Sequence, residues 1–318
     1  MGMLNKIIYH FFKGDLLKIY KRKKMGSKYL NGWNIQEKNY LIKLGKNCLG
    51  YKMNLDNPQT LNEKLNYYKL HYNNPLIHDV VDKIKSKEYV KSKGLEEIII
   101  KTIITYDSLD EFKLEDMPKQ FVVKNTLDSG GVYVCKDKSN ANLESIKRKL
   151  TVLEKEISNG RHWACEKAYI GQNNVNKIIV EEVLNTNDGH APADYKFFCF
   201  NGEPKFLYVG SEREADVKFD FYDINFNWID VRQGHRNNVK NRPVKPKNYD
   251  KMIEICRILS KDFPHVRVDL YNIDGKIYFG ELTFYHDAAL VSFDPKSYDL
   301  EFGKYFDIES INKSKYYI

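Results

Sequence analysis

The sequence lacks long apolar runs, paired cysteines and a strong excess of one charge. No stretch reaches the roughly 20 apolar residues that a transmembrane helix needs. The 5 cysteines are scattered and form no CxxC pair, so neither a disulfide framework nor a zinc site is indicated, and we expect a cytoplasmic protein. With 51 basic and 43 acidic residues, the formal charge of +8 suits an anionic ligand or a membrane surface but is too small for a dedicated nucleic-acid-binding protein.

The N-terminal segment also lacks the features of a secretory signal. Residues 1–25 carry a short apolar stretch that His10 and Lys13 interrupt, and the basic residues follow it. A signal peptide has its charge before the apolar stretch. The plain interpretation is an amphipathic surface helix. The alternative is peripheral contact with a membrane through the basic N-terminus, at the inner face.

The 318 residues include 42% hydrophobic and 14% aromatic residues, enough for about two domains or one core with a lid. Residues up to about 95 have mainly helical patterns. Thr60 and Glu63 form a capping-box signature in "NPQTLNEKLNYYKLHY". The stretch "NPLIHDVVDKIKSKEYVKSKG" predicts a second helix that ends at Gly94.

Beyond Gly94 the sequence becomes rich in strands. We expect strands in "EIIIKTIITY", "QFVVK", "VYVCKD" and "KIIVEEVL", and two hairpins that turn at Asn201-Gly202 and Asp274-Gly275. Helices are expected in "NLESIKRKLTVLEKEI" and "NYDKMIEICRILSKDF". Hairpin-linked strands among helices predict an α+β protein with antiparallel sheets.

The last hairpin places a carboxylate, Glu281, inside the strand-like stretch "YFGELTFY". A two-residue turn would pair Asp269 with Gly280 and send Glu281 to the other face. A three-residue loop, residues 273–275 with Gly275 in a bulge, pairs Asp269 with Phe279 instead, and we predict this loop. Four polar side chains then share one face of the hairpin: Arg267, Asp269, Glu281 and Thr283.

Two neighbouring carboxylates repel each other, and a divalent cation holds both in the ionised form. Mg²⁺ accepts one or two carboxylates together with phosphate oxygens and water. Asp269 and Glu281 in surface salt bridges with nearby lysines are an equally good interpretation of the hairpin alone.

A glycine pair follows another strand in "FVVKNTLDSGGVYVCKD". The strand ends on Lys124, and Ser129, Gly130 and Gly131 form the loop, whose backbone N–H groups are free of Cβ obstruction and suit an anion. A plain tight turn is the commoner explanation of such a pair. The loop is not a Walker loop, because no GxxxxGK[ST] precedes a helix.

In order along the chain, these features resemble the ATP-grasp fold, and more closely the TupA-like ATP-grasp family of bacterial cell-surface polysaccharide gene clusters. The resemblance runs from about Asn57 to Ile308. The stretches that carry it are "LNEKLNYYKL", "DKIKSKEYVK", "QFVVKNTLDSGGVYVCKDKS", "DYKFFCFNGEPKF" and "HVRVDLYNIDGKIYFGELTFY". It implies a helical lead-in over residues 1–75 and an ATP-grasp domain over 76–318, with a glycine-loop lid at about 119–183 and a metal- and phosphate-binding core at about 184–318.

The resemblance also implies roles for individual residues. Lys83 and Lys124 would contact the phosphates of ATP, and Ser129, Gly130 and Gly131 would cover them. Residues 181–184 would form the hinge strand beside adenine, with main-chain groups of Glu182 and Val183 reading the base. The full expected set is Lys124, Lys196 and Arg267 for catalysis; Lys83, Lys124, Ser129, Gly130, Gly131, Glu181, Glu182, Val183, Leu184, Asp194 and Lys196 for the nucleotide; and Asp269, Glu281 and Thr283 for one or two Mg²⁺ ions.

Some of these positions have plainer explanations or depart from the family pattern. Lys83 could be a solvent-facing lysine of a Lys-rich helix, and Glu181 with Glu182 could simply end a surface strand. Thr283 stands where many ATP-grasp enzymes carry a metal-binding Asn. The loop "LDSGG" replaces a His-Gly-Ser-Gly-Gly type of loop, and "YHDAAL" lacks the Pro-Gly that often follows the metal strand.

The implied activity is ATP-dependent ligation of a carboxylate to an amine through an acyl phosphate. In a polysaccharide pathway the carboxylate would be that of a uronic acid, and the amine that of an amino acid or amino sugar. A transferase, labelled a glycosyltransferase or acting as an ATP-dependent phosphotransferase on a sugar, is the alternative. A non-catalytic nucleotide-binding subunit is the third.

Overall fold

The structure is a computed structural model that describes residues 35–127, 131–158, 175–186, 189–212, 217–234, 238 and 242–318. These residues fall into two compact units. Among the described residues, the smaller unit contains those within 75–88 and 100–183, and the larger contains those within 35–74, 89–99 and 184–318. Residues 35–74, part of the lead-in that we expected over residues 1–75, group with the larger unit, and one boundary lies between Val183 and Leu184.

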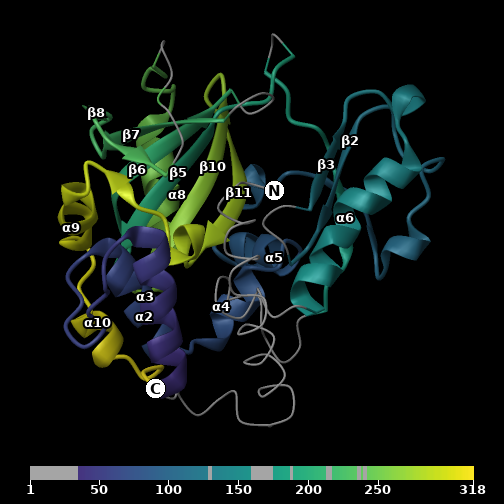
Figure 1. Cartoon of the computed structure of the whole chain (residues 1–318). Helices are drawn as coiled ribbons and strands as arrows, with labels where there is room; N and C mark the ends of the chain where they lie inside the picture. The colour runs from purple at the N-terminus through teal and green to yellow at the C-terminus, as the bar shows by residue number, and fades with distance from the viewer. Residues whose placement is uncertain are drawn as a thin grey trace. The chain divides into compact units, whose positions relative to one another are not determined.

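The smaller unit is built on a four-stranded antiparallel sheet with the strand order β1-β4-β2-β3. Helix α6 packs on β2 and β3 (Figure 1). Its elements are α4 (Pro75–Val80), the start of α5 (Lys85–Ser92), β1 (Thr102–Tyr106), η2 (Leu109–Glu111), β2 (Phe121–Asn125), β3 (Val132–Cys135), η3 (Lys138–Asn140), α6 (Leu143–Ser158) and β4 (Ile178–Glu181). The strands predicted in "QFVVK", "VYVCKD" and "KIIVEEVL" and the helix predicted over "NLESIKRKLTVLEKEI" are confirmed. The strand predicted in "EIIIKTIITY" forms only over its second half, as β1, because Glu96–Ile98 form the short helix η1.

The single helix predicted over residues 74–94 is wrong, because the chain breaks it into α4 and α5. Asp82 lies at the break, and its Oδ1 accepts hydrogen bonds from the backbone N–H groups of Ile84 at 2.8 Å and Lys85 at 3.1 Å. An aspartate that binds free N–H groups in this way starts a new helix. The predicted end at Gly94 is confirmed: its φ is +73°, and the N–H of Leu95 reaches back to the carbonyl of Val90.

The larger unit is built on a six-stranded antiparallel sheet with the order β11-β10-β5-β6-β7-β8. The capping box of Thr60 and Glu63 is formed at the start of α3, as predicted. Its elements are α2 (Ile35–Leu49), α3 (Leu61–His71), η1 (Glu96–Ile98), β5 (Asp194–Phe200), β6 (Glu203–Ser211), β7 (Lys218–Asp223), β8 (Trp228–Ile229), β9 (Arg232–Gln233), α8 (Tyr249–Ser260), β10 (His265–Ile273), β11 (Lys276–Thr283), η5 (His286–Ala289), β12 (Phe293–Asp294), α9 (Ser297–Gly303) and α10 (Glu309–Asn312).

Helices α8 and α9 cover opposite faces of this sheet. Neighbouring residues on a strand point to opposite faces. Phe197 packs on Tyr249 of α8, with 5.9 Å between ring centroids. Phe198 stacks on Phe206, whose ring stacks in turn on Phe302 of α9 at 4.0 Å. These rings are among the most deeply buried side chains of the unit, so aromatic packing fills its core on both faces.

Both predicted hairpins form, but the loop of the second is not the predicted one. Phe200 pairs with Glu203 across Asn201-Gly202, as expected. Ile273 pairs with Lys276, so the second turn has two residues, Asp274 at φ +52° and Gly275 at φ +98°. A two-residue turn with positive φ at both central residues follows the twist of antiparallel strands, and the pair Asp-Gly favours this turn. The predicted three-residue loop with its bulge at Gly275 is therefore wrong.

The bulge lies at Gly280 instead. Leu270 pairs with Phe279 and Asp269 pairs with Glu281, which leaves Gly280 as the extra residue of β11. A Cβ on Gly280 would lie 2.9 Å from the carbonyl oxygen of Asp269, so only glycine fits without a backbone shift. The bulge reverses the alternation that the two-residue turn sets, and Glu281 reaches the face on which Asp269 lies.

Two expectations from the composition concern disulfide bonds and membrane-spanning helices in the described part of the chain. Among the described residues, Cys48, Cys135, Cys199 and Cys256 form no disulfide bond. No helix in the described part of the chain is both long enough and apolar enough to cross a membrane.

Candidate active site

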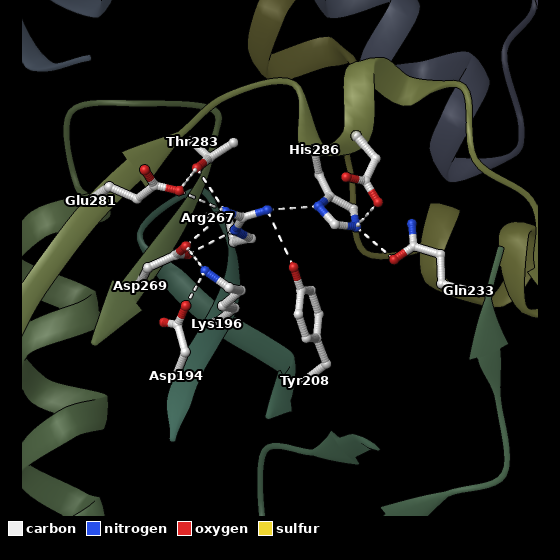
Figure 2. A network of polar contacts seen from close by, with 10 residues as sticks. Asp194, Lys196, Tyr208, Gln233, Arg267, Asp269, Glu281, Thr283 and His286 are labelled. Atoms are coloured by element: carbon white, nitrogen blue, oxygen red, sulfur yellow. Dashed lines mark hydrogen bonds and ion pairs between the residues drawn. The ribbon is translucent and has the colours of Figure 1, made fainter. Parts of the chain in front are cut away.

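One face of the β10–β11 hairpin carries the polar side chains that the sequence pattern predicts there. Arg267 pairs with Thr283, and Asp269 pairs with Glu281, so all four point to the same side (Figure 2). Asp269 is only 1% exposed. The surface salt-bridge interpretation is therefore wrong for this carboxylate.

Arg267 is the centre of the cluster. Its Nε and Nη2 donate to the two oxygens of Asp269, each at 2.7 Å, in a bidentate pair. Nη2 also donates to Glu281 Oε1 at 3.1 Å and to Thr283 Oγ1 at 2.9 Å. Oxygen atoms of three side chains thus converge on one positively charged nitrogen.

Strand β5 adds Asp194 and Lys196 from beside β10. Lys196 pairs in register with Asp269, and its Nζ forms ion pairs with that carboxylate and, at 2.6 Å, with Asp194 Oδ2. The prediction that Asp194 and Lys196 share one face is confirmed. Burial would lower the pKa of Lys196, but the two carboxylates outweigh it and hold this pKa well above its usual value.

The cluster continues through three residues that sequence reasoning missed. Arg267 Nη1 lies 3.4 Å from the hydroxyl of Tyr208 and 2.7 Å from Nδ1 of His286. Nε2 of His286 lies 2.7 Å from Oε1 of Gln233 (Figure 2). Tyr208 shares a face with Lys196 by register on β6, which the hairpin pattern could have indicated. Nothing in the sequence marks His286 or Gln233, because they come from η5 and β9, and only the tertiary packing of these elements brings them to Arg267.

Burial controls the charge of Asp269. It raises the pKa of this carboxyl to about 6, although Arg267 and Lys196 oppose the rise, while the nearby Glu281 adds to it. Coulomb attraction to Asp269 more than offsets the burial of Arg267 and raises the pKa of its guanidinium. The face therefore combines fixed positive charge with carboxylates that gain from any further cation.

The donor set of Asp269, Glu281 and Thr283 fits a Mg²⁺ ion. Within the described residues there is no group of three or more His, Cys, Asp or Glu side chains placed to hold a metal by themselves. Two carboxylates and a hydroxyl that converge on one cationic nitrogen are nonetheless hard oxygen donors of the kind that Mg²⁺ shares with phosphate oxygens.

The smaller unit holds a second charged cluster. Glu181, at the end of β4, is 3% exposed and forms ion pairs with both Lys124 of β2 and Lys87 of α5. Nζ of Lys87 also donates to the carbonyl of Ile100 and to Thr102 Oγ1, each at 2.7 Å. Burial would raise the pKa of Glu181, but the two lysines outweigh it and hold this pKa below its usual value. The interpretation of Glu181 as the exposed end of a surface strand is wrong.

The family comparison decides which class of protein this chain resembles. The TupA-like ATPgrasp family matches residues 63–307. The chain belongs to this family. The predicted family and the predicted α+β fold with antiparallel sheets are therefore confirmed.

Solved structures similar to this TupA-like ATP-grasp chain are distant, and no curated protein sequence matches it. D-alanine–D-alanine ligase from Bacillus anthracis is 15% identical, with 74% of this chain and 69% of that chain covered and a TM-score of 0.41. D-alanine–D-alanine ligase from Helicobacter pylori is 17% identical, with 72% of this chain and 61% of that chain covered and a TM-score of 0.34. An L-amino acid ligase from Bacillus licheniformis is 14% identical, with 64% of this chain and 42% of that chain covered and a TM-score of 0.36.

The remaining expected nucleotide residues of the TupA-like chain lie around its smaller sheet. Lys83 is half-buried in the turn between α4 and α5, and its backbone N–H donates to the carbonyl of Thr126 at 3.1 Å. Lys83 therefore lies in a turn and not on the Lys-rich helix that the alternative interpretation assumed. Lys87, one turn further on, is the lysine that reaches Glu181; the Lys-rich stretch "DKIKSKEYVK" offers no signal that separates the two.

The hinge and the glycine loop are only partly described. The backbone N–H of Glu182 donates to the carbonyl of Lys101 at 3.1 Å, and Val183 and Leu184 follow β4, half-buried. The carbonyl of Gly131 accepts the N–H of Asn125 at 3.0 Å. Ser129, Gly130 and the basic N-terminal segment lie outside the described residues.

Proposed function

We propose that this chain is an ATP- and Mg²⁺-dependent carboxylate–amine ligase of cell-surface polysaccharide biosynthesis, acting on a uronic acid. The observation that carries the proposal is the convergence of Asp269, Glu281 and Thr283 on Arg267. A catalyst of phosphoryl transfer needs oxygen donors for a cation and fixed positive charge for the phosphate oxygens, and this face supplies both. Membership of the TupA-like ATPgrasp family supports ATP as the nucleotide that the chain binds.

The smaller unit would bind the nucleotide. Lys124 and Lys87 carry the positive charge that ATP phosphates require, with Glu181 as the carboxylate that orients both side chains. Lys83 and the loop around Gly131 would complete the phosphate contacts. Main-chain groups of Glu182 and Val183 would read adenine; because the N–H of Glu182 is bonded to Lys101, its carbonyl is the group that we assign to the base.

The larger unit would perform the transfer. Asp269, Glu281 and Thr283 would hold Mg²⁺, which neutralises charge on the phosphate oxygens. A carboxylate oxygen of the substrate attacks the γ-phosphorus, the bond to ADP breaks, and an acyl phosphate forms. Arg267 and Lys196 stabilise the negative charge that develops. An amine then attacks the acyl carbon, phosphate leaves, and the amine loses its proton to water.

The test is a screen for ADP release with Mg²⁺, ATP, uronic acids and amino acids, on the wild type and on Glu281→Gln. Loss of one of the carboxylates should lower turnover about 100-fold or more. Glu203→Gln is the matched control, because Glu203 is half-exposed in the same sheet and pairs with Arg257 outside the cluster. It should turn over at the wild-type rate.

Three outcomes would contradict the proposal. Unchanged turnover in Glu281→Gln removes this residue from the metal site. Formation of AMP in place of ADP and phosphate rules out the acyl phosphate. Thermal stabilisation by a UDP-sugar with Mn²⁺, but not by ATP with Mg²⁺, identifies the transferase alternative.

A further inference from the structure

The segment after the Glu281 strand has an unusual backbone. Asp287, Ala288 and Ala289 have φ values of +44°, +60° and +55°. Alanine rarely adopts the left-handed region, Asp does so only somewhat more often, and a run of three such residues persists only where the surroundings hold it. His286, which contacts Arg267, is the residue directly before this run.

One face of α3 holds the segment. Asn62, Asn66 and Lys69 are spaced so that they share a face of the helix, and they are 3%, 0% and 0% exposed. Lys69 Nζ donates to the carbonyl of Ala288 at 2.9 Å, and Asn66 Nδ2 donates to that of Ala289 at 2.9 Å. Asn62 Nδ2 donates to the carbonyl of Val291 at 3.2 Å. Two of the left-handed residues are thus bound directly.

The held segment sets the ring of His286. A guanidinium only donates hydrogen bonds, so Nδ1 of His286 accepts from Arg267. Nε2 must then carry the proton, and it donates to Oε1 of Gln233. The ring is fixed in one tautomer and fills the side of the guanidinium that Asp269 and Glu281 leave open (Figure 2).

We propose that Asn66 and Lys69 are positioning residues of the active site. They hold residues 288–289 left-handed, seat His286 against Arg267, and so fix the guanidinium beside Asp269 and Glu281. Where it concerns turnover, this inference rests on the proposed function. Where it concerns the His286 ring, it does not.

Helix α3 also offers a matched control. Lys64 Nζ donates to the carbonyls of Gly303 at 2.9 Å and Phe306 at 2.8 Å. Like Lys69, Lys64 therefore binds backbone carbonyls of the larger unit, but these carbonyls lie at the end of α9 and just after it. Replacing Lys64 removes similar structural bonds without touching the segment that carries His286.

The experiment compares Lys69→Met, Lys69→Arg and Lys64→Met. Ring ¹⁵N shifts are recorded on ¹⁵N-histidine-labelled protein without substrate, with the His286 signals assigned through His286→Gln. The wild type should show the Nε2–H tautomer. Lys69→Met should lose it, whereas Lys64→Met and the donor-retaining Lys69→Arg should keep it.

Turnover is the second readout. A misplaced guanidinium should lower kcat of Lys69→Met about tenfold or more while the KM for ATP stays unchanged. Lys64→Met should match the wild type. If neither the wild type nor any variant releases ADP, the proposed function fails. The His286 ring signals still decide whether Lys69 positions the ring.

Two results would overturn the inference. One is a folded Lys69→Met protein with wild-type His286 signals. The other is a failed rescue in the double variant Lys69→Met, Ala288→Gly. Because glycine adopts the left-handed region without a restraint, adding Ala288→Gly to Lys69→Met should restore the His286 signals. Failure of that rescue rejects the link through the backbone. If Lys69→Met does not fold, Asn66→Ala takes its place with the same expectations.

Discussion

At the scale of single residues, His265 shows how a buried group sets the response to pH. It is 0% exposed at the start of β10, and its ring stacks on Phe200 with 4.6 Å between centroids. Nδ1 lies 2.9 Å from the carbonyl of Cys199, to which it donates, and Nε2 has no hydrogen-bond partner among the described residues. Burial lowers the pKa of His265 to about 3, and the positive charge of Arg267 adds to this effect.

Acidification should therefore destabilise the fold through His265. Between the folded pKa of about 3 and the unfolded value of about 6.5, the unfolded chain binds a proton that the folded one does not. The free energy of unfolding should fall by up to about 1.4 kcal/mol per pH unit as pH drops through this window. Urea titrations from pH 7 to pH 4 on the wild type and His265→Gln, which keeps an N–H donor but does not titrate, measure the difference.

His190→Gln, a substitution at an exposed histidine, is the control and should leave the wild-type slope intact. Parallel pH profiles for the wild type and His265→Gln would show that the ring does not couple to folding.

At the scale of elements, the β10–β11 hairpin depends on one glycine. The turn at Asp274-Gly275 sets a register in which Glu281 would point away from Asp269, and the bulge at Gly280 corrects it. The faces predicted from alternation are right, although the reason is a bulge five residues beyond the predicted one. Sequence patterns could specify the shared face but not the position of the extra residue, because the approach of the Asp269 carbonyl decides it.

Gly280→Ala should destabilise the protein by about 1–3 kcal/mol, because the added Cβ meets a backbone oxygen that cannot move alone. Gly210→Ala is the control: its Cβ would be 3.7 Å from its neighbours, an ordinary contact in the same sheet. The control should leave the free energy of unfolding unchanged or slightly higher. Equal urea midpoints for Gly280→Ala and the wild type would mean that the bulge tolerates a side chain.

At the scale of the whole molecule, each compact unit contains its own buried charged cluster. Glu181 gathers two lysines in the smaller unit, and Arg267 gathers carboxylates and hydroxyls in the larger one. Each cluster joins strands that are not consecutive in the chain, and each contains an ion pair at which one partner lies under a tenth exposed. Breaking one partner of such a pair leaves a buried charge uncompensated.

Binding of ATP should raise the stability of the folded chain by mass action. At an ATP concentration 100 times its Kd the gain is about 2.7 kcal/mol, which a thermal melt with and without ATP and Mg²⁺ detects. Lys124→Met should reduce this shift. Lys177→Met, at a half-exposed lysine of the same unit that pairs with Asp107, should retain it. Equal shifts in Lys124→Met and the wild type would remove Lys124 from the nucleotide site.

The sequence by itself determined most strands and helices, both hairpins, and the shared face of Arg267, Asp269, Glu281 and Thr283. Hydrophobic periodicity, turn chemistry and strand alternation act over a few residues, so they can be read locally. Only the tertiary structure decided that Lys87 meets Glu181, that Gly280 is the bulged residue, and that His286 meets Arg267. Those contacts depend on strand register and on where α3 holds a left-handed loop, which no local pattern encodes.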